Sequence, residues 1–168
     1  MDTEPGTEMN RTDAPLHWTC AKFNDLTLEE LYANLRLRTD VFSVEQHAIY
    51  QDLDGKDQGS LHLMGRQEDR LVAYCRILPP GLAFEEASIG RVVTALTHRG
   101  TGTGKILFQK GLDICIDRFG DGPIRIGAQF YLVGFYGSFG FRVEGNIYLE
   151  DGIEHVHMLR PGSGHVRQ

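Results

Sequence analysis

The fold is decided by Ser88-Ile-Gly-Arg-Val-Val-Thr-Ala-Leu-Thr-His-Arg-Gly-Thr-Gly-Thr-Gly-Lys105, in which an apolar strand-like run leads through a loop with three alternating glycines into a helix. Gly100, Gly102 and Gly104 lack the Cβ atoms that would hold a ligand away from the backbone. The first N–H groups of the helix have no partner within it and carry the positive end of its dipole. Because an exposed helix end contributes only about 0.3–1 kcal/mol per charge, several amides must act together. This arrangement favours a site for a pyrophosphate over one for a lone carboxylate.

Spacing separates three kinds of glycine-rich loop that bind phosphates. The phosphate loop of nucleoside triphosphatases needs glycine and Ser or Thr at positions that hold Arg99 and Ile106. The dinucleotide-binding fingerprint needs glycine where the chain has Lys105. The pattern that fits is Gln or Arg, then two residues, Gly, one residue, and Gly or Ala, which matches Arg99, Gly102 and Gly104. A connection without a ligand has no need of three glycines, because each costs conformational entropy.

The composition predicts one soluble domain. The chain has 168 residues, of which 41% are apolar and 24% charged, so it can bury a sizeable core. We expect residues 15–160 to form this domain, with a disordered tail at residues 1–14 and a flexible tail at residues 161–168. The first tail lacks the apolar segment of a signal peptide and nothing suggests a membrane span, so a cytoplasmic location is expected. Three cysteines in apolar runs are expected to be buried, reduced thiols: Cys20, Cys75 and Cys115.

Charge is segregated along the chain. The net charge of −6 and the isoelectric point near 5.6 argue against a nucleic-acid partner. Residues 90–110 hold four basic residues and no acid, around the predicted phosphate site. Residues 45–57 hold four acids and one Lys, and residues 144–154 hold four acids and no Lys or Arg. These acidic segments either attract a cationic amine or are ordinary solvated loops.

The acidic segment after residue 45 does not match a calcium-binding loop. An EF-hand loop that started at Asp52 would need Gly and Glu at positions that hold Asp57 and Leu63. We therefore expect no metal site.

Periodicity predicts an α/β protein with a mixed, mostly antiparallel central sheet flanked by helices. Thr27-Leu-Glu-Glu30 is a capping box that begins a helix running to about Val44, with Leu28, Leu31 and Leu35 on an apolar face. A second helix runs from the glycine loop to residue 119, and a short third helix covers residues 130–139. The predicted strands cover residues 16–23, 61–67, 70–78, 87–94, 124–128, 141–149 and 155–159.

Several segments resemble one known family. The loop around Gly102 resembles the acetyl-CoA loop of the GNAT superfamily of N-acetyltransferases, and Gly140-Phe141 after Phe135-Tyr136 resembles the family's second motif. More narrowly, the chain resembles the ElaA subgroup of bacterial acetyltransferases over about residues 17–160. Five segments carry this narrower resemblance: Val41-Phe-Ser-Val-Glu-Gln46, Tyr50-Gln-Asp-Leu-Asp-Gly55, Arg76-Ile-Leu78, Gly127-Ala-Gln129 and Glu150-Asp-Gly-Ile153.

The resemblance implies direct transfer of an acetyl group from acetyl-CoA to a primary amine of a small molecule or peptide. The implied CoA contacts come from a strand end, a loop and two later residues: Val92, Val93, Thr94, Arg99, Gly100, Thr101, Gly102, Thr103, Gly104, Lys105, Gln129 and Tyr136. In the family, a backbone N–H at the end of the fourth strand polarises the thioester carbonyl, here around residues 92–94. The implied acid is Tyr136, because a phenol with a pKa of about 10 can protonate a CoA thiolate with a pKa of about 8.5.

The base that deprotonates the acceptor is less well defined. An alkyl ammonium is only about one part in a thousand neutral at physiological pH, so such an acceptor needs a base. Many members of the family carry an acid on the fifth strand, at a position where this chain has Ile124. Glu45 is our predicted base, because its Val-Glu-Gln segment matches the ElaA subgroup and the family's geometry places this region beside the acceptor. His155 and His157 alternate on one face of a strand, where paired histidines are more often structural than catalytic.

The predicted function is therefore that of an acetyl-CoA-dependent N-acetyltransferase, with a monomer or homodimer as the expected assembly and neither nucleic acid nor membrane as a partner. One alternative is a non-catalytic acyl-CoA sensor, which would keep the glycine loop without needing Tyr136. Another is an acyl-homoserine-lactone synthase, whose enzymes share this fold and open with a segment similar to Arg38-Thr-Asp-Val-Phe42. Those enzymes usually take acyl groups from a carrier protein, so an intact CoA loop favours the N-acetyltransferase.

Overall fold

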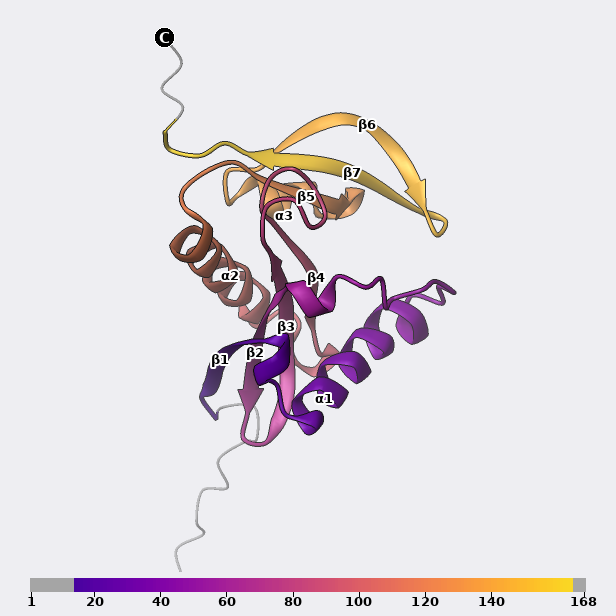
Figure 1. Ribbon diagram of the computed structural model, residues 1–168. Helices are drawn as coiled ribbons and strands as arrows, with labels where there is room; N and C mark the ends of the chain where they lie inside the picture. Colours follow the sequence, from indigo (N-terminus) through magenta and orange to yellow (C-terminus); the bar gives the residue numbers. More distant parts are fainter. Residues whose placement is uncertain (1–13, 165–168) are drawn as a thin grey trace, which may run out of the picture.

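The computed structural model describes residues 14–164, which form a mixed α/β fold of antiparallel sheets flanked by helices, as predicted (Figure 1). The first sheet has the strand order β1 (Leu16–Lys22), β2 (Leu61–Gln67), β3 (Arg70–Leu78) and β4 (Ser88–Thr94). The second sheet has the order β5 (Ile124–Gln129), β7 (Ile153–Arg160) and β6 (Arg142–Glu150). The predicted tails fall largely on residues 1–13 and 165–168, outside the described residues.

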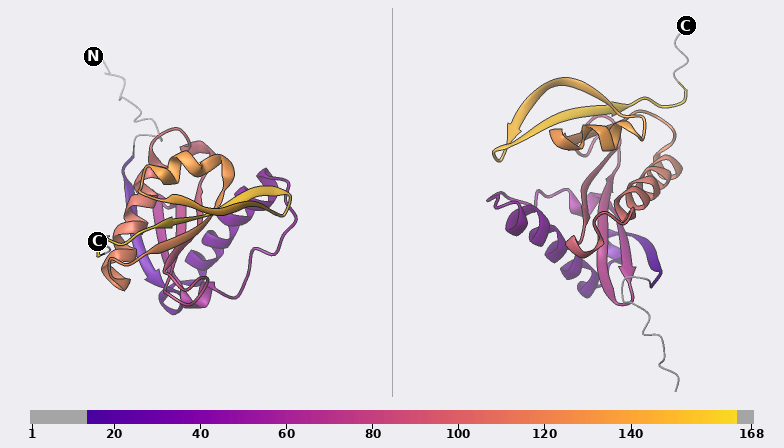
Figure 2. Two further views of the ribbon diagram at one scale, coloured as in Figure 1. Left: turned by 90° about the horizontal axis from the view of Figure 1, so that it is seen from above. Right: turned by 180° about the vertical axis from the view of Figure 1, so that it is seen from behind.

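Two helices cover opposite faces of the first sheet. Figure 2 shows α1 (Leu28–Thr39) on one side of β2–β4 and α2 (Thr103–Phe119) on the other. Because successive side chains of a strand point to opposite faces, β3 is buried at every position from Val72 to Leu78. Tyr74 belongs to the core under α1, and Cys75 belongs to the core under α2. No helix within residues 14–164 combines the length and the apolar character needed to cross a membrane.

The predicted start of α1 is confirmed, but of its predicted apolar face Leu31 and Leu35 are only half-buried and Leu28 is exposed. Thr27 Oγ1 accepts from the Glu30 backbone N–H at 3.1 Å, and Glu30 Oε1 accepts from the Thr27 N–H at 3.2 Å, which completes the capping box. Leu28 is 86% exposed, whereas the side chains that α1 buries are Asn34, Leu37 and Arg38. On this side of the helix Leu37 packs in one core cluster with Val72 and Tyr74 of β3, and Arg38 forms ion pairs to the following loop. The helix continues beyond residue 39 as a π-helical turn, Asp40–Glu45.

Two of the three cysteines are buried free thiols, as predicted. Cys75 and Cys115 lie in the core under α2. Cys20 is exposed, contrary to the prediction, because β1 is the edge strand and α2 packs mainly on β3 and β4.

The two sheets meet at one end of β4 and then separate. Ala87 forms a parallel bridge with Ile124, and the Arg125 N–H donates to the Ala87 carbonyl at 3.0 Å. Beyond this point β4 pairs with β3 and β5 pairs with β7, so a gap opens between β4 and β5. The third helix, predicted as one piece, is a 3-10 turn at Phe130–Leu132 followed by the short α3 (Val133–Gly137).

Candidate active site

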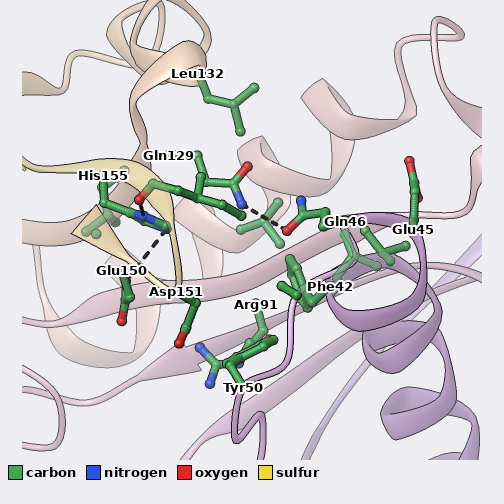
Figure 3. Close-up of a pocket in the computed structure, with 18 of the residues that line it drawn as sticks. Phe42, Glu45, Gln46, Tyr50, Arg91, Gln129, Leu132, Glu150, Asp151 and His155 are labelled. Atoms are coloured by element: carbon green, nitrogen blue, oxygen red, sulfur yellow. Dashed lines mark hydrogen bonds and ion pairs between the residues drawn. The ribbon is translucent and has the colours of Figure 1, made fainter. Parts of the chain in front are cut away.

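A cavity of about 810 Å³ lies where β4 and β5 separate (Figure 3). Its walls come from β4, β5, the segment after α1, the turn before α3, and the turn between β6 and β7. Seven of the predicted site residues line it: Glu45, Val92, Val93, Thr94, Arg99, Gln129 and Tyr136. The remaining ones, residues 100–105, form the adjoining loop and the first turn of α2 rather than the wall of the cavity.

The wall formed by β4 contains a β-bulge. Tyr74 pairs with Val93 and Arg76 pairs with Gly90, which leaves two β4 residues opposite Cys75 alone. One of them, Arg91, has a φ of +51°, a left-handed conformation that is uncommon for a residue with a side chain. A bulge leaves its extra residue outside the ladder of hydrogen bonds. The strand end predicted to polarise a carbonyl therefore lies at an interruption of the sheet.

The three glycines of the loop are not all explained by backbone conformation. Gly100 and Gly102 have φ values of +71° and +83°, conformations that favour glycine whether or not a ligand is bound. Gly104 has no such constraint, and a Cβ atom there would meet only the Thr94 Cγ2 atom, at 3.9 Å. Gly102 is also the N-cap of α2, so no capping side chain covers the first amides of the helix. The start of α2 is therefore free of a side-chain cap.

Arg99 and Glu45 are held together at the edge of the cavity. The Arg99 Nη2 atom donates to Glu45 Oε2 at 2.7 Å, and Nη1 donates to Oε1. The hydrogen bonds from Arg99 lower the pKa of the Glu45 carboxyl. A carboxylate with a lowered pKa is a weaker base, so the pair supports a role for Glu45 in holding Arg99, and the base role stays a prediction.

Tyr136 is almost fully buried and reaches the cavity from α3. It is 8% exposed and packs edge to face on Phe108, with ring centroids 5.0 Å apart, and on Phe135, at 5.1 Å. Burial raises the pKa of the Tyr136 hydroxyl. The hydroxyl therefore stays protonated throughout the neutral range, which is the state that a proton donor needs, although the same shift makes the phenol a weaker acid.

An ionic cluster that sequence reasoning missed lies below the cavity. Its members are three arginines from α1, β3 and β4 and three aspartates from the loop before β2: Arg38, Arg76, Arg91, Asp52, Asp54 and Asp57. Asp57 accepts from Arg38 and from Arg76 at 2.9 Å each, and Arg91 donates to Asp52 at 2.7 Å. The three aspartates of the first acidic segment are thus neutralised by arginines. The sequence shows these residues only as isolated charges, because the three arginines lie in elements that are far apart in the chain.

The turn between β6 and β7 carries the second acidic segment to the mouth of the cavity. Glu150 and Asp151 line the cavity opposite Tyr50 and Arg91 (Figure 3). His155 lies behind them on β7, with Nε2 3.6 Å from Glu150 Oε2. The Asp-Gly turn was predicted, but its position against the segment after α1 depends on how the two sheets diverge.

Comparisons with known proteins agree on one family. The model of the acetyltransferase (GNAT) domain family matches residues 24–160. Protein ElaA of Escherichia coli is 42% identical over 147 residues, which are 86% of this chain and 96% of that protein. The crystal structure of Escherichia coli ElaA has a TM-score of 0.82 at 40% identity and covers 87% of this chain and 99% of its own.

Two further solved structures extend the comparison. An acyl-CoA N-acyltransferase from Pseudomonas aeruginosa has a TM-score of 0.83 at 42% identity and covers 87% of this chain and 99% of its own. A CoA-dependent acyl-homoserine lactone synthase has a TM-score of 0.69 at 18% identity and covers 86% of this chain and 81% of its own. At that identity the likeness extends to the fold alone.

Proposed function

The chain belongs to the acetyltransferase (GNAT) family, and from this premise we propose that it transfers an acetyl group from acetyl-CoA directly to a primary amine of a small molecule or peptide. The observation that carries the proposal is the cavity of about 810 Å³ between β4 and β5, which adjoins the uncapped start of α2. Its volume lies within the range of about 300–1,000 Å³ that is usual for ligand sites.

The donor would lie across the start of α2. The amides of residues 102–105 and the Arg99 guanidinium would bind the pyrophosphate, because several donors and a helix end act on one anion. The thioester would then reach the bulge of β4, where an N–H among residues 92–94 can stabilise the oxyanion that forms on the carbonyl. Gln129, whose amide donates to Gln46 at 3.2 Å, would contact the donor from the β5 side.

Tyr136 would act as the acid. When the C–S bond breaks, the electron pair goes to sulfur, and the phenol can supply the proton that makes CoA a stable leaving group. The apolar surroundings of the ring keep competing water away from the hydroxyl.

The test is Tyr136→Phe, which removes the hydroxyl and keeps the ring. We expect kcat to fall by about 10²-fold, the low end for a general acid, with the affinity for acetyl-CoA unchanged by calorimetry. Tyr131→Phe is the matched control, because Tyr131 lines the same cavity but is 73% exposed and should tolerate the change. An unchanged kcat for Tyr136→Phe, with chemistry shown to limit the rate, would assign Tyr136 to the core alone.

The same assay separates the two alternatives. A sensor would bind acetyl-CoA without acetylating any amine. An acyl-homoserine-lactone synthase would consume S-adenosylmethionine, which is present in the solved structure of the CoA-dependent synthase. Because that synthase depends on CoA, the CoA loop of this chain does not argue against the synthase alternative, and a direct assay with S-adenosylmethionine is needed.

A further inference from the structure

We propose that His155 is the base that takes a proton from the acceptor ammonium, and that Glu150 positions the ammonium beside it. This inference rests on the proposed acyl transfer and adds the residue that prepares the nucleophile. His155 lines the same cavity as Tyr136, and its ring lies beside Glu150 at the turn between β6 and β7 (Figure 3).

The position of the proton on the neutral ring follows from the hydrogen bond of His155 to Ile153. The His155 Nδ1 atom is 2.8 Å from the carbonyl oxygen of Ile153. A carbonyl oxygen can only accept, so Nδ1 carries the proton and Nε2 keeps its lone pair. Tyr148 stacks on the ring, with centroids 5.8 Å apart and planes at 26°, which fixes the ring's orientation. The ring thus offers a basic nitrogen in a defined direction.

The groups around the ring suit an arriving cation. The distance of 3.6 Å between Nε2 and the Glu150 carboxylate is too long for a hydrogen bond, but an ammonium lying to one side of the two atoms could contact both. Glu45 and Asp54, which also line the cavity, are held by arginines, whereas within residues 14–164 neither Glu150 nor Asp151 pairs with Arg or Lys. Glu150, a carboxylate of the cavity without an Arg or Lys partner in this range, therefore lies beside the histidine.

The other groups near the ring are Gln129, Tyr148 and His157, which packs on Tyr148 with ring centroids 5.0 Å apart. Gln129 faces His155 across the β5–β7 pairing. Burial, with a further contribution from Glu150, raises the pKa of Tyr148, so this phenol is uncharged at neutral pH. When Nε2 takes a proton, the charge that appears on the ring is balanced by the Glu150 carboxylate.

The proton and electron movements balance with one base and one acid. Nε2 of His155 takes the first proton of the ammonium and later releases it to solvent. The lone pair freed on nitrogen forms the C–N bond, and the C–S pair goes to sulfur, which takes the proton of Tyr136. The second proton lost by nitrogen restores the phenol through water. The products are the amide, CoA as the thiol, and one proton in solution.

The experiment measures kcat/KM against pH for wild type, His155→Gln and His155→Phe, with acetyl-CoA and either cadaverine or alanine amide as the amine. Wild type should lose activity on the acidic side as one group takes up a proton. In both variants kcat/KM should be at least tenfold lower than in wild type near neutral pH. Both should also lack this fall in activity towards acidic pH, here called the acidic limb, and should become faster as the pH approaches the pKa of the amine. His155→Phe keeps the stack on Tyr148, so a fall caused only by lost packing would not occur in it.

Three further variants sharpen the test. His157→Gln is the matched control, because His157 lies two residues along β7 and does not line the cavity, but shares with His155 a contact to Tyr148, with centroids 5.0 Å apart. Its profile should match that of wild type. Glu150→Gln should raise KM for both amines and keep the acidic limb, as expected of a positioning residue. Glu45→Gln should leave the acidic limb in place.

Failure of the His155 proposal can be distinguished from failure of the proposed function. A wild-type chain that acetylates neither amine overturns the proposed function, and this inference with it. A competent wild type whose His155→Gln variant keeps the rate and the acidic limb overturns this inference alone. Histidine ¹⁵N chemical shifts that place the neutral ring's proton on Nε2 would also overturn it.

Discussion

At the scale of single residues, Gly104 is the glycine that reports on the ligand. Gly102 has a φ of +83°, so any side chain there strains the backbone and obscures an effect on binding. Gly104 is free of that strain, and a Cβ atom would make only an ordinary contact with Thr94. Glycine is also about 1 kcal/mol worse than alanine within a helix. Its presence at this position is therefore explained best by a ligand that approaches the backbone.

We accordingly expect Gly104→Val to keep or raise the melting temperature while weakening acetyl-CoA binding more than tenfold, or about 1.4 kcal/mol. Gly104→Ala is the matched control, because a single methyl group projects less far towards the pyrophosphate and should have the smaller effect. Titration calorimetry measures the affinity of both. A folded Gly104→Val variant with wild-type affinity would show that the pyrophosphate does not bind at this loop.

At the scale of elements, the loop before β2 is held to the sheet by buried charges. Asp57 is 6% exposed, and its carboxylate accepts from two arginines that are themselves buried. Breaking such a group by removing one partner leaves a buried charge without compensation, at a cost of about 3–5 kcal/mol. This loop leads from the end of α1 to the mouth of the cavity, so its attachment also sets the shape of the site.

We expect Asp57→Asn to lower the free energy of unfolding by about 3–5 kcal/mol, as measured by urea denaturation. The matched control is Asp113→Asn on α2, where an exposed carboxylate accepts only from Gln109 at 2.9 Å. That substitution should change the free energy of unfolding by no more than about 0.5 kcal/mol. A loss for Asp57→Asn no larger than that of the control would mean that the cluster adds no net stability.

Local patterns predicted most elements, and long-range contacts explain what they missed. The capping box at Thr27 and the β2–β3 hairpin depend on neighbours in sequence, and both were predicted with their bounds nearly correct. Leu28 was assigned to a buried face because apolar spacing was the only signal available, yet α1 buries Leu37 in the core and Arg38 beside two aspartates of the next loop. Arg91 lies in the bulge of β4 and lines the cavity. No residue type in that strand predicts a bulge.

At the scale of the whole molecule, buried titratable groups make stability depend on pH in two windows. His62 is 1% exposed and is held neutral between the Asp57 carbonyl, at 2.9 Å from Nε2, and the Tyr74 hydroxyl, at 2.7 Å from Nδ1. Burial lowers the pKa of His62, and burial also lowers that of His98. Since the unfolded chain takes up these protons at a pH of about 6.5, stability is complete above that pH and falls as the pH drops towards the lowered values of the folded state.

The second window belongs to the carboxylates. Burial raises the pKa of Asp54 and Asp57, but the hydrogen bonds these carboxylates accept and the charges of the arginines together outweigh burial and lower both pKa values. An unfolded Asp takes up its proton at about pH 3.9, so the stability contributed by these groups is complete above that pH and is lost as the pH falls below it. Acid should therefore destabilise the protein in two stages, histidines first and aspartates second.

We predict that the melting temperature is level from about pH 7 to 8 and starts to fall below about pH 6.5, where each histidine lowers the free energy of unfolding by no more than about 1.4 kcal/mol per pH unit. His62→Gln should be less stable than wild type at pH 8, because it loses a buried ring, but its melting temperature should fall less between pH 7 and 5. His98→Gln should flatten the same window by a smaller amount, since its ring lies nearer the surface. The decline below pH 4 should persist in both variants, because it belongs to the aspartates. An equal fall between pH 7 and 5 in wild type and His62→Gln would show that His62 is not the group that couples folding to protonation in this range.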